Sequence, residues 1–366
     1  MSYNDDLFLI IYFLIGVTVL LIKKRSLLSK YYLFYALICI SFLFIHPFLL
    51  NNLNSISINF GYALKVITFL LVISVLGYNN FSNTYLNIIF VLSCFNLVLY
   101  FDQTFLFKLS RPLSGLLTTF DNNVLYENYI FFVKQTISLS YENFNPDGFI
   151  KNPGIFGEGG RYQYFLNLAL IINLYFYNKP ILSFKSIILI ISILTTFSTV
   201  GYIIMVAVLG FKIIGESTEN YRKLKIVLII PFLVLLLFSD VITTKFFLTG
   251  SNAFTSTQRR ILDTIIDYNI IKEQPILGIG LGNMKAYKAY SAQYTGGGSS
   301  SNGLTNYISK IGLLGFIITL YPFIFIDIKR KKNKIILLCN GLTLITQGII
   351  LTPIFLLSMS LLNQKE

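Results

Sequence analysis

Two adjacent arginines, Arg259 and Arg260, stand in one of the few polar stretches of an otherwise apolar chain. The stretch reads Thr257-Gln-Arg-Arg-Ile-Leu-Asp263. A guanidinium group hydrogen-bonds two phosphate oxygens at once, which an ammonium group cannot do in the same fixed geometry. The pair is therefore a candidate site for a phosphate or diphosphate group. The alternative is an ordinary pair of solvated surface arginines.

A bend and a small-residue run follow the arginines. The bend lies in Gln274-Pro-Ile-Leu-Gly-Ile-Gly-Leu-Gly282 and contains Gly278, Gly280 and Gly282. It lacks the strand-helix-strand context and the spacing of a dinucleotide-binding fingerprint. We predict instead a loop that bends after a helix ending near Gln274. The run Gly296-Gly-Gly-Ser-Ser-Ser-Asn-Gly303 contains Asn302, which we expect to position the loop together with the glycines.

A second polar motif, Lys151-Asn-Pro-Gly-Ile-Phe-Gly-Glu-Gly-Gly-Arg161, lies directly before an apolar run. Its glycines allow close backbone approach, so we expect Glu158 and Arg161 at the membrane face. The alternative is an ordinary junction between a loop and a helix, in which Glu158 is simply favourable near the helix N-terminus.

Lys65 lies about one and a half turns inside the third apolar run, counted from its external end. An ionisable side chain within a membrane span is a functional candidate unless it snorkels to the surface. The single histidine, His46, ends the second apolar run beside Pro47 and is best explained as a satisfied helix-end residue. The sequence contains no cluster of metal ligands, so we expect neither a metal nor a cofactor.

Membrane helices must position these residues, because 55% of the chain is hydrophobic, 12% is charged and the mean hydropathy is +0.69. We predict an all-α polytopic membrane protein with about 10–12 transmembrane helices. Residues 1–366 are expected to form a single membrane domain. The net charge of +13 comes mostly from short loops between spans. The positive-inside rule explains that distribution better than a nucleic-acid partner does.

The basic loops fix the expected topology. Alternation of spans puts four short basic loops on the cytoplasmic side, and they lie at 23–30, 179–185, 222–225 and 329–334. Two large loops, 102–161 and 242–303, then fall on the extracytoplasmic side together with the N-terminus. The first apolar run is expected to be a span and not a removable signal peptide, because no cleavage motif follows it.

Two apolar segments allow more than one arrangement. Within the first large loop, Leu125 to Leu139 is apolar enough to lie along the membrane surface or to dip into it as a re-entrant segment. The last apolar run, 335–362, is long for one span, and Gln347, Gly348 and Pro353 divide it into two half-helices or two short spans. Cys39, Cys94 and Cys339 lie in separate apolar runs, so no disulfide framework is expected.

The order of these motifs resembles a known family. An arginine about fifteen residues before Pro-Ile-Leu-Gly-x-Gly-x-Gly, followed by an Asn-containing turn and then Gly312-Leu-Leu-Gly315, resembles the large extracytoplasmic loop of the O-antigen polymerase and O-antigen ligase superfamily. Gly-Ile-Phe followed by Glu-Gly-Gly before a span, and Phe197-Ser-Thr-Val-Gly-Tyr-Ile203, resemble two further segments of that superfamily. The resemblance covers about Lys151 to Gly315.

The resemblance implies a GT-C-like multi-span fold, a site on the extracytoplasmic face of the bacterial cytoplasmic membrane, and metal-independent glycosyl transfer. The donors would be oligosaccharide repeat units linked to undecaprenyl diphosphate. The growing glycan would pass to the non-reducing-end sugar of another lipid-linked repeat unit. Besides these substrates and the lipid bilayer, the partners would be a chain-length regulator protein and a flippase.

The resemblance also suggests roles for the candidate residues. Charge on the departing diphosphate would be stabilised by cations, with Arg260 and Arg259 as the first candidates and Lys65, Arg161 and Lys151 as further ones. Glu158 is the candidate base for the attacking hydroxyl group.

Two other functions compete with polymerisation. A ligase would transfer the same glycan to lipid A core, but such ligases usually carry a His-Asn pair before the terminal Gly-Leu-x-Gly helix, and here Ser301 precedes Asn302. A flippase or other transporter would bind the diphosphate without chemistry. Two large loops on one face favour surface chemistry over alternating access.

Overall fold

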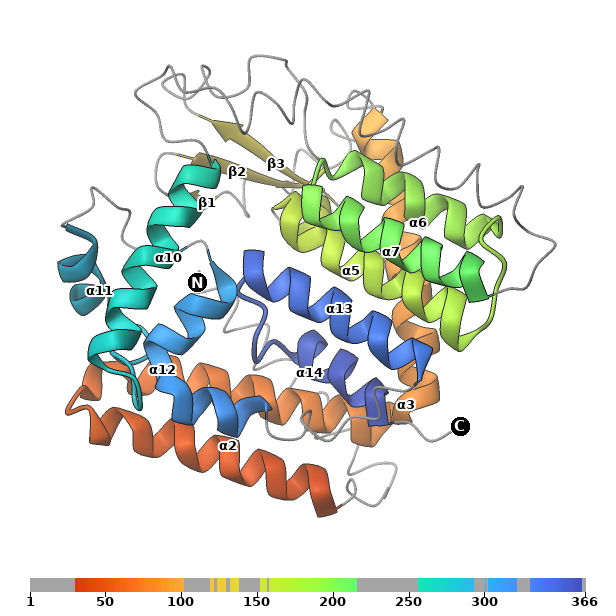
Figure 1. The fold of residues 1–366 in the computed structure, drawn as a ribbon. Coiled ribbons are helices and arrows are strands. Elements are labelled where there is room, and N and C mark those ends of the chain that lie inside the picture. Colours follow the sequence, from red (N-terminus) through yellow and green to blue (C-terminus); the bar gives the residue numbers. More distant parts are fainter. Residues whose placement is uncertain are drawn as a thin grey trace. The chain divides into compact units, whose positions relative to one another are not determined.

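Membrane helices dominate the fold of the computed structural model (Figure 1). The described residues are 30–101, 119–121, 124–129, 132–137, 152–156, 158–215, 256–292, 300, 302–320 and 330–363. Four described helices are long and apolar enough to cross a membrane: Tyr32–Leu49, Ile56–Gly77, Asn80–Phe101 and Gly303–Leu320. Backbone groups in lipid must be satisfied within the segment, which a helix achieves. The expected class, a polytopic α-helical membrane protein, is confirmed apart from one small sheet.

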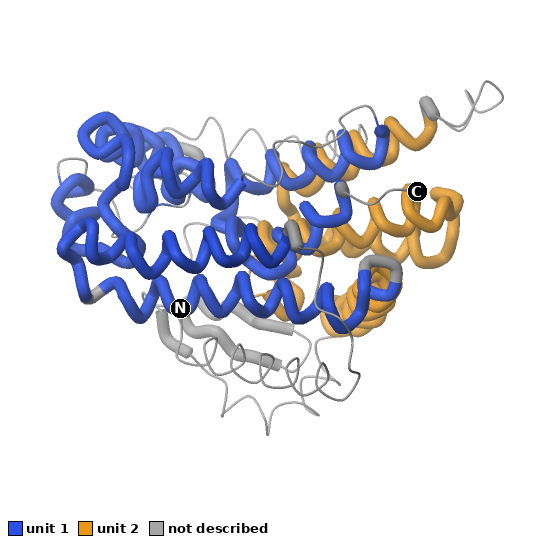
Figure 2. The backbone as a smooth tube through the Cα atoms, turned by 90° about the horizontal axis from the view of Figure 1, so that it is seen from below, with its two compact units in different colours: residues 1–81, 233–366 blue, residues 82–232 orange. Residues whose placement is uncertain are grey.

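The chain divides into two compact units, coloured separately in Figure 2. One unit comprises residues 1–81 and 233–366, and the other comprises residues 82–232.

The first unit contains two spans joined by a short turn. Helix α2 covers Lys30–Leu49, a 3₁₀ turn covers Leu53–Ser55, and helix α3 covers Ile56–Phe101. Gly77 interrupts α3 with non-helical angles (φ 68°, ψ 168°), and α3 continues from there into the second unit. A positive φ is accessible to glycine without steric cost, which explains why the interruption falls at this residue.

The second part of the same unit carries the segment with the paired arginines. Its helices are α10 (Ser256–Glu273), α11 (Met284–Ser291), α12 (Gly303–Leu320), α13 (Lys331–Thr346) and α14 (Pro353–Ser360). Helix α12 is central, because it packs against α2, α10 and α13. A 3₁₀ turn, Leu361–Asn363, follows α14.

The predicted division of the last apolar run is present. Helix α13 ends at Thr346 and α14 begins at Pro353, so the break falls across Gln347 and Gly348. The Thr352 side chain caps α14 by accepting a hydrogen bond from the backbone N–H of Phe355, and Pro353 occupies the first turn, where its missing N–H costs nothing. The apolar runs at 7–22 and 226–241 lie outside the described residues, so the expected total of about 10–12 spans stays a prediction.

Among its described residues, the second unit contains the last part of α3 and three helices that pack together. Helix α5 (Gly159–Ile171) continues into a π-helical turn (Ile172–Phe176) and packs against α6 (Phe184–Thr195) and α7 (Thr199–Gly215). The Ser183 hydroxyl caps α6 by accepting a hydrogen bond from the N–H of Ser186. Nearly every side chain of α5 is buried, as expected for a helix with neighbours on several sides.

A small antiparallel sheet is the departure from the all-α expectation. Strands β1 (Thr119–Asp121), β2 (Val124–Tyr129) and β3 (Phe132–Ile137) pair in sequence order. The segment from Leu125 to Leu139, expected to lie along the membrane or to re-enter it, thus forms two strands over most of its length. Its Val, Tyr, Phe, Thr and Ile side chains favour a pleated strand over a helix.

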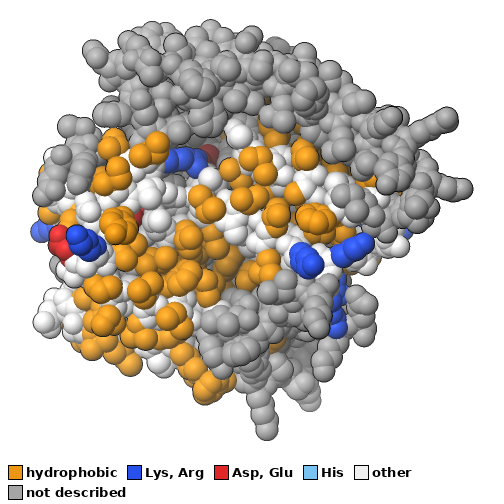
Figure 3. Space-filling model, in the orientation of Figure 1, with side chains coloured by type: hydrophobic (Ala, Val, Ile, Leu, Met, Phe, Trp, Pro, Cys, Tyr) orange, Lys and Arg blue, Asp and Glu red, His pale blue; other side chains and the backbone are white. Residues whose placement is uncertain are grey.

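Apolar side chains cover much of the described surface on the face drawn in Figure 3, while Lys and Arg are confined to a few places. On α2, Phe34, Leu37 and Phe48 are each about 60% exposed. Such a surface is typical of helices that face lipid.

Candidate functional site

A break in the middle of α12 explains the spacing of the glycines. Gly312 has φ 68° and ψ 176° inside this helix. In an unbroken helix the N–H groups of Leu313 and Leu314 would donate to the carbonyls four residues earlier. Here they donate instead to the carbonyls of Pro275 (2.8 Å) and Ile276 (3.2 Å) in the loop after α10.

The same loop satisfies the carbonyls that the break leaves open. The N–H of Ile279 donates to the carbonyl of Ser309 (3.0 Å), and the N–H of Gly280 donates to that of Lys310 (2.8 Å). Two helical hydrogen bonds are thus replaced by four bonds to the 275–280 turn. A broken membrane helix is tolerated where neighbouring backbone satisfies its groups.

Close approach requires glycine at two of these positions. A Cβ on Gly278 would lie 2.5 Å from the carbonyl oxygen of Ser309, and one on Gly312 would lie 2.0 Å from that of Ile276. Both residues also have positive φ, 63° and 68°. Gly280 and Gly282 likewise have positive φ, 97° and 76°. The predicted bend after a helix ending near Gln274 is therefore present, although its role in activity stays a prediction.

The glycine turn also contacts the ends of α2 and α3. A Cβ on Gly282 would meet the side chain of Ile58, and one on Gly280 would meet Leu50 at 3.2 Å. The His46 Nε2 donates to the carbonyl of Leu277 at 2.7 Å. His46 is thus a helix-end residue bonded to the turn, as expected.

One face of α10 is polar and turned toward α12. Arg260, Asp263, Thr264 and Asp267 have the spacing i, i+3, i+4 and i+7, which places them along one side of the helix. Asp263 and Asp267 are 2% and 0% exposed. We call this set the polar face of α10.

Asn302 joins the polar face from the start of α12. Its Nδ2 donates to the hydroxyl of Thr264 at 2.6 Å, and Thr264 in turn donates to the carbonyl of Arg260 at 2.8 Å. Gly303, the first residue of α12, lies so close to α13 that a Cβ would meet the Gln347 carbonyl oxygen at 2.0 Å. The structure thus brings Asn302 to the turn of α10 that carries Arg260.

Asp267 accepts three side-chain hydrogen bonds. Its Oδ2 accepts hydrogen bonds from the hydroxyls of Ser300 (2.8 Å) and Thr305 (2.7 Å), and its Oδ1 accepts one from Ser309 (3.0 Å). Burial raises the pKa of Asp267 from 3.8 to about 6, although the three hydroxyls and Lys310 favour the ionised form.

Tyr287 of α11 belongs to an apolar cluster that includes side chains of α10. It is 1% exposed and packs with Ile266, Ile270 and Ile279. Burial raises the pKa of the Tyr287 hydroxyl far above its ordinary value, and the charges of Asp267 and Asp263 raise it further. The hydroxyl therefore stays neutral at physiological pH.

Lys65 is buried in α3. Its side chain is 6% exposed, and Nζ lies 4.6 Å from the centre of the Tyr62 ring, within cation–π range. The protein thus covers most of Lys65, which favours a buried cation over the alternative of a side chain that snorkels to the membrane surface.

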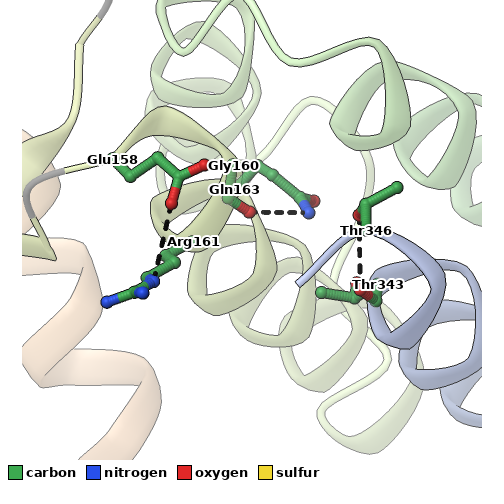
Figure 4. Close-up of polar contacts among 6 residues, drawn as sticks. All are labelled: Glu158, Gly160, Arg161, Gln163, Thr343 and Thr346. Atoms are coloured by element: carbon green, nitrogen blue, oxygen red, sulfur yellow. Dashed lines mark hydrogen bonds and ion pairs between the residues drawn. The ribbon is translucent and has the colours of Figure 1, made fainter. Parts of the chain in front are cut away.

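The Glu158 motif belongs to the second unit. Glu158 is the residue before α5, and its Oε2 lies 3.6 Å from Nε of Arg161 (Figure 4). Both side chains are well exposed, 48% for Glu158 and 63% for Arg161. An exposed ion pair of this kind contributes little to stability, so both groups remain accessible to a ligand.

Packing within the second unit brings two of the sequence motifs together. The Nδ2 of Asn152 donates to the hydroxyl of Thr195 (3.0 Å), and its backbone N–H donates to the Thr195 carbonyl (2.9 Å). A Cβ on Gly159 would lie 2.5 Å from the carbonyl oxygen of Thr196. The Glu158 motif therefore lies against the α6–α7 turn, which carries the Phe197-Ser-Thr-Val-Gly-Tyr-Ile203 motif.

The predicted site residues thus fall into two described groups. Arg260, Asn302 and the three glycines lie on or beside α10 and α12, and Lys65 lies in α3 of the same unit. Glu158 and Arg161 lie together in the other unit. Arg259 lies in α10, but its side chain and Lys151 are outside the described residues. Among the residues described, no group of three or more His, Cys, Asp or Glu could hold a metal ion.

Sequence reasoning missed Asp267. The helical spacing of Arg260, Asp263, Thr264 and Asp267 would have indicated one polar face, but the three hydroxyl donors lie 33 to 42 residues further along the chain. Nothing in the local sequence pairs them with this carboxylate.

Comparison with known proteins gives one family. No curated protein and no solved structure matches the chain. A family model described as O-antigen ligase matches residues 184–320, a range that contains α6, α7, the polar face of α10, the glycine turn and α12. Residues 184–320 are therefore similar to the O-antigen ligase family, in agreement with the resemblance that the sequence motifs indicate.

Proposed function

We propose that the protein is a surface-polysaccharide polymerase of the O-antigen type. It transfers a growing glycan from undecaprenyl diphosphate to the non-reducing-end sugar of another lipid-linked repeat unit. The family match supports a function of the O-antigen polymerase or ligase kind. The choice of the polymerase and the assignment of residues are the parts that we propose.

The environment of the Arg260 side chain is the observation that carries the proposal. Its side chain is half-buried on the polar face of α10, and no described carboxylate forms an ion pair with it. Its helical turn is fixed through Thr264 to Asn302, at the start of α12. A guanidinium held in this way is suited to bind an anionic group that comes from outside the protein.

The chemistry makes two demands on the protein. The acceptor hydroxyl oxygen attacks the anomeric carbon of the donor glycan, and the bond between that carbon and the diphosphate oxygen breaks. The leaving undecaprenyl diphosphate keeps the electron pair. We assign the stabilisation of this developing charge to Arg260 and its neighbour Arg259, and we keep Lys65, Arg161 and Lys151 as further candidate cations. One preorganised donor of this kind contributes about 3 kcal/mol to a transition state.

The proton of the acceptor hydroxyl passes to Glu158 in this proposal. Glu158 is exposed and directly precedes the first turn of α5. Its carboxylate is therefore open to an incoming sugar. A positioned base contributes roughly 10²–10⁴-fold to the rate. The cations supply the charge stabilisation, so this scheme has no step that depends on a metal.

The proposal also includes location and partners. The protein is a multi-pass membrane protein, and we place it in the bacterial cytoplasmic membrane with a GT-C-like arrangement and its site on the extracytoplasmic face. Its substrates are lipid-linked repeat units, and it binds them within the lipid bilayer. A flippase would deliver the repeat units and a chain-length regulator would act on the product.

Ligation to lipid A core is the second candidate, because the matching family model is described as O-antigen ligase. The residue before Asn302 favours the polymerase, since Ser301 stands where such ligases usually carry a histidine. A serine hydroxyl is a much weaker base than an imidazole at neutral pH.

Purified protein supplied with lipid-linked repeat units and lipid A core as competing acceptors separates the candidates. Chain lengthening supports the polymerase, transfer to lipid A core supports the ligase, and the absence of any transfer supports a transporter.

Arg260→Ala should lower the rate of chain lengthening at least about 100-fold. Arg260→Lys should retain only part of the rate, because an ammonium group cannot form the two parallel hydrogen bonds that a guanidinium forms with phosphate.

Lys272→Ala is the matched control for Arg260→Ala, because it removes another cation of α10 at the opposite, exposed end of the helix. It should leave the rate close to that of the unmodified protein. A normal rate in Arg260→Ala, at an equal level of folded protein, would rule out the role of Arg260.

A further inference from the structure

We propose that Asp267 is a positioning residue, whose carboxylate holds the segment from Ser300 to Ser309 in the geometry that places Asn302 beside Arg260. This inference rests on the proposed function for its effect on rate. Its structural part concerns residues that neither the motifs nor the family match assign.

The carboxylate binds three hydroxyls of one segment. Ser300 precedes α12, while Thr305 and Ser309 lie one turn apart within it, on the same side of the helix. Their oxygens are 2.7 to 3.0 Å from Asp267. Asp267 thus connects α10 to both the loop before α12 and the first turns of α12.

The contacts continue from Asp267 to Asn302. The backbone N–H of Asn302 donates to the hydroxyl oxygen of Ser300 at 3.1 Å. The Ser300 hydroxyl donates its single hydrogen to the carboxylate of Asp267 and accepts from Asn302 through a lone pair. Ser300 therefore connects Asp267 to the backbone of Asn302.

The side chain of Asn302 completes the connection. Its Nδ2 donates to Thr264, and the Thr264 hydroxyl donates to the backbone of Arg260. A continuous series of hydrogen bonds therefore runs from Asp267, through the start of α12, back to the turn of α10 that carries Arg260. Such a network is stronger as a unit than as separate pairs.

An ionised group is needed for this arrangement. A carboxylate only accepts hydrogen bonds, so it orients all three hydroxyls toward itself, whereas a protonated or amide side chain also donates. A buried charge lowers stability, so packing alone does not account for an acid at a position that is 0% exposed.

The charged and titratable groups around Asp267 come from three elements. Lys310 of α12 favours the ionised form, while Asp263 of α10 and Tyr287 of α11 also interact with this region electrostatically. Protonation at Oδ2 would convert this acceptor oxygen into a donor, so Ser300 or Thr305 would lose its partner, whereas the Ser309 hydroxyl also donates to the Asn306 carbonyl at 3.0 Å. The orientation of the segment therefore depends on an ionised Asp267.

The first measurement is hydrogen exchange by mass spectrometry on peptides covering residues 300–310, with no substrate present. Asp267→Asn keeps the size of the side chain but removes the charge, and Thr305→Val removes one donor without changing shape. Both should accelerate exchange in these peptides at least about 10-fold. Ser291→Ala is the control, because the Ser291 hydroxyl bonds only to the Lys288 carbonyl of its own helix.

The second measurement is the rate of chain lengthening by folded protein. Asp267→Asn should lower kcat about 10-fold to 100-fold, as misplacement of a catalytic group does, and should change KM for the lipid-linked donor less than about 3-fold. The unmodified protein should lose activity as the pH falls below about 6. In Asp267→Asn this acid limb should be absent.

Each outcome decides one part of the inference. Unchanged exchange at residues 300–310 in Asp267→Asn would overturn the structural role, whatever the reaction is. Faster exchange with a normal kcat and an unchanged pH profile would show that the role is purely structural. No chain lengthening by the unmodified protein would refute the proposed function, while the exchange data would still decide whether Asp267 orders the segment.

Discussion

The pKa of Asp267 predicts an unusual dependence of stability on pH. Burial raises this pKa from 3.8 to about 6, and one pKa unit corresponds to about 1.4 kcal/mol. An ionised Asp267 therefore lowers the free energy of unfolding by about 3 kcal/mol at pH 7.5, relative to a carboxyl group with its ordinary pKa. The side chain is completely buried, so solvent does not screen this effect.

The sign follows from proton binding. Because the pKa of Asp267 is higher in the folded protein than in the unfolded chain, the folded protein binds more protons between about pH 4 and pH 6. The contribution of this group to stability therefore increases as the pH falls through that window. This is the reverse of a carboxylate whose pKa is depressed by an ion pair.

The perturbation that isolates this effect is Asp267→Asn, which cannot be protonated in this range. At pH 7.5 the variant gains about 3 kcal/mol from the missing charge and loses about 1 kcal/mol for an altered hydrogen bond. The variant should therefore be the more stable protein at pH 7.5. Its advantage should shrink by about 2 kcal/mol at pH 4.5, where most of the unmodified Asp267 is already protonated in the folded state.

Thermal unfolding in detergent, followed by circular dichroism, measures this advantage. A difference of 2 kcal/mol corresponds to about 3 °C in Tm for a chain of 366 residues. Ile265→Ala, an exposed and non-titrating change on the same helix, should differ from the unmodified protein by the same amount at every pH. If the difference between Asp267→Asn and the unmodified protein were equally independent of pH, the reasoning from burial would be refuted.

Three further predictions address the glycine turn, the base and the topology. Gly312→Ala should lower the free energy of unfolding by more than about 2 kcal/mol, because the added Cβ would meet backbone atoms and the residue has a positive φ. Gly341→Ala is the control and should be neutral or slightly stabilising, since its Cβ would meet nothing within 4 Å. The yield of monodisperse protein and Tm measure both effects. Glu158→Gln should change stability by less than about 0.5 kcal/mol but lower kcat roughly 10²-fold or more if Glu158 is the base, and an unchanged kcat would assign the base elsewhere. A cysteine at Ser299, in a background without the native cysteines, should react with an impermeant thiol reagent in cells with a permeabilised outer membrane; labelling only after the inner membrane is broken would reverse the topology.

Hydropathy and residue spacing predicted the membrane-spanning helices well, because the apolar environment alone determines their structure. Uninterrupted apolar runs gave the spans at α2, α3 and α12, and Pro353 gave the break before α14. In lipid the backbone has few alternatives to a helix, so composition is sufficient. The sheet at 119–137 escaped prediction because the same apolar, β-branched composition also fits a strand outside the membrane.

The sequence indicated the residue types of the candidate site but not how they pair. Arg260, Asn302 and the glycines were chosen because arginine and positive-φ glycine have few interchangeable roles, and their part in activity stays a prediction. The ion pair of Glu158 with Arg161 is local, at i and i+3, and follows from sequence distance alone. The binding of Asp267 to Ser309 depends on tertiary packing between residues 42 positions apart, which no periodicity reports.

One turn of α12 shows why the glycine turn and the acid occur in the same protein. Ser309 offers its carbonyl to the N–H of Ile279 because Gly312 breaks the helix, and it offers its hydroxyl to Asp267. Lys310 likewise offers its carbonyl to Gly280, while its ammonium favours the charge on Asp267. Without the break, these carbonyls would be used inside α12, and the 275–280 turn would have no backbone to bind. The break therefore fixes the C-terminal end of α10, and Asp267 fixes its middle. A helix held at two places along one side leaves little freedom for the turn that carries Arg260, which is the condition a bidentate phosphate ligand requires.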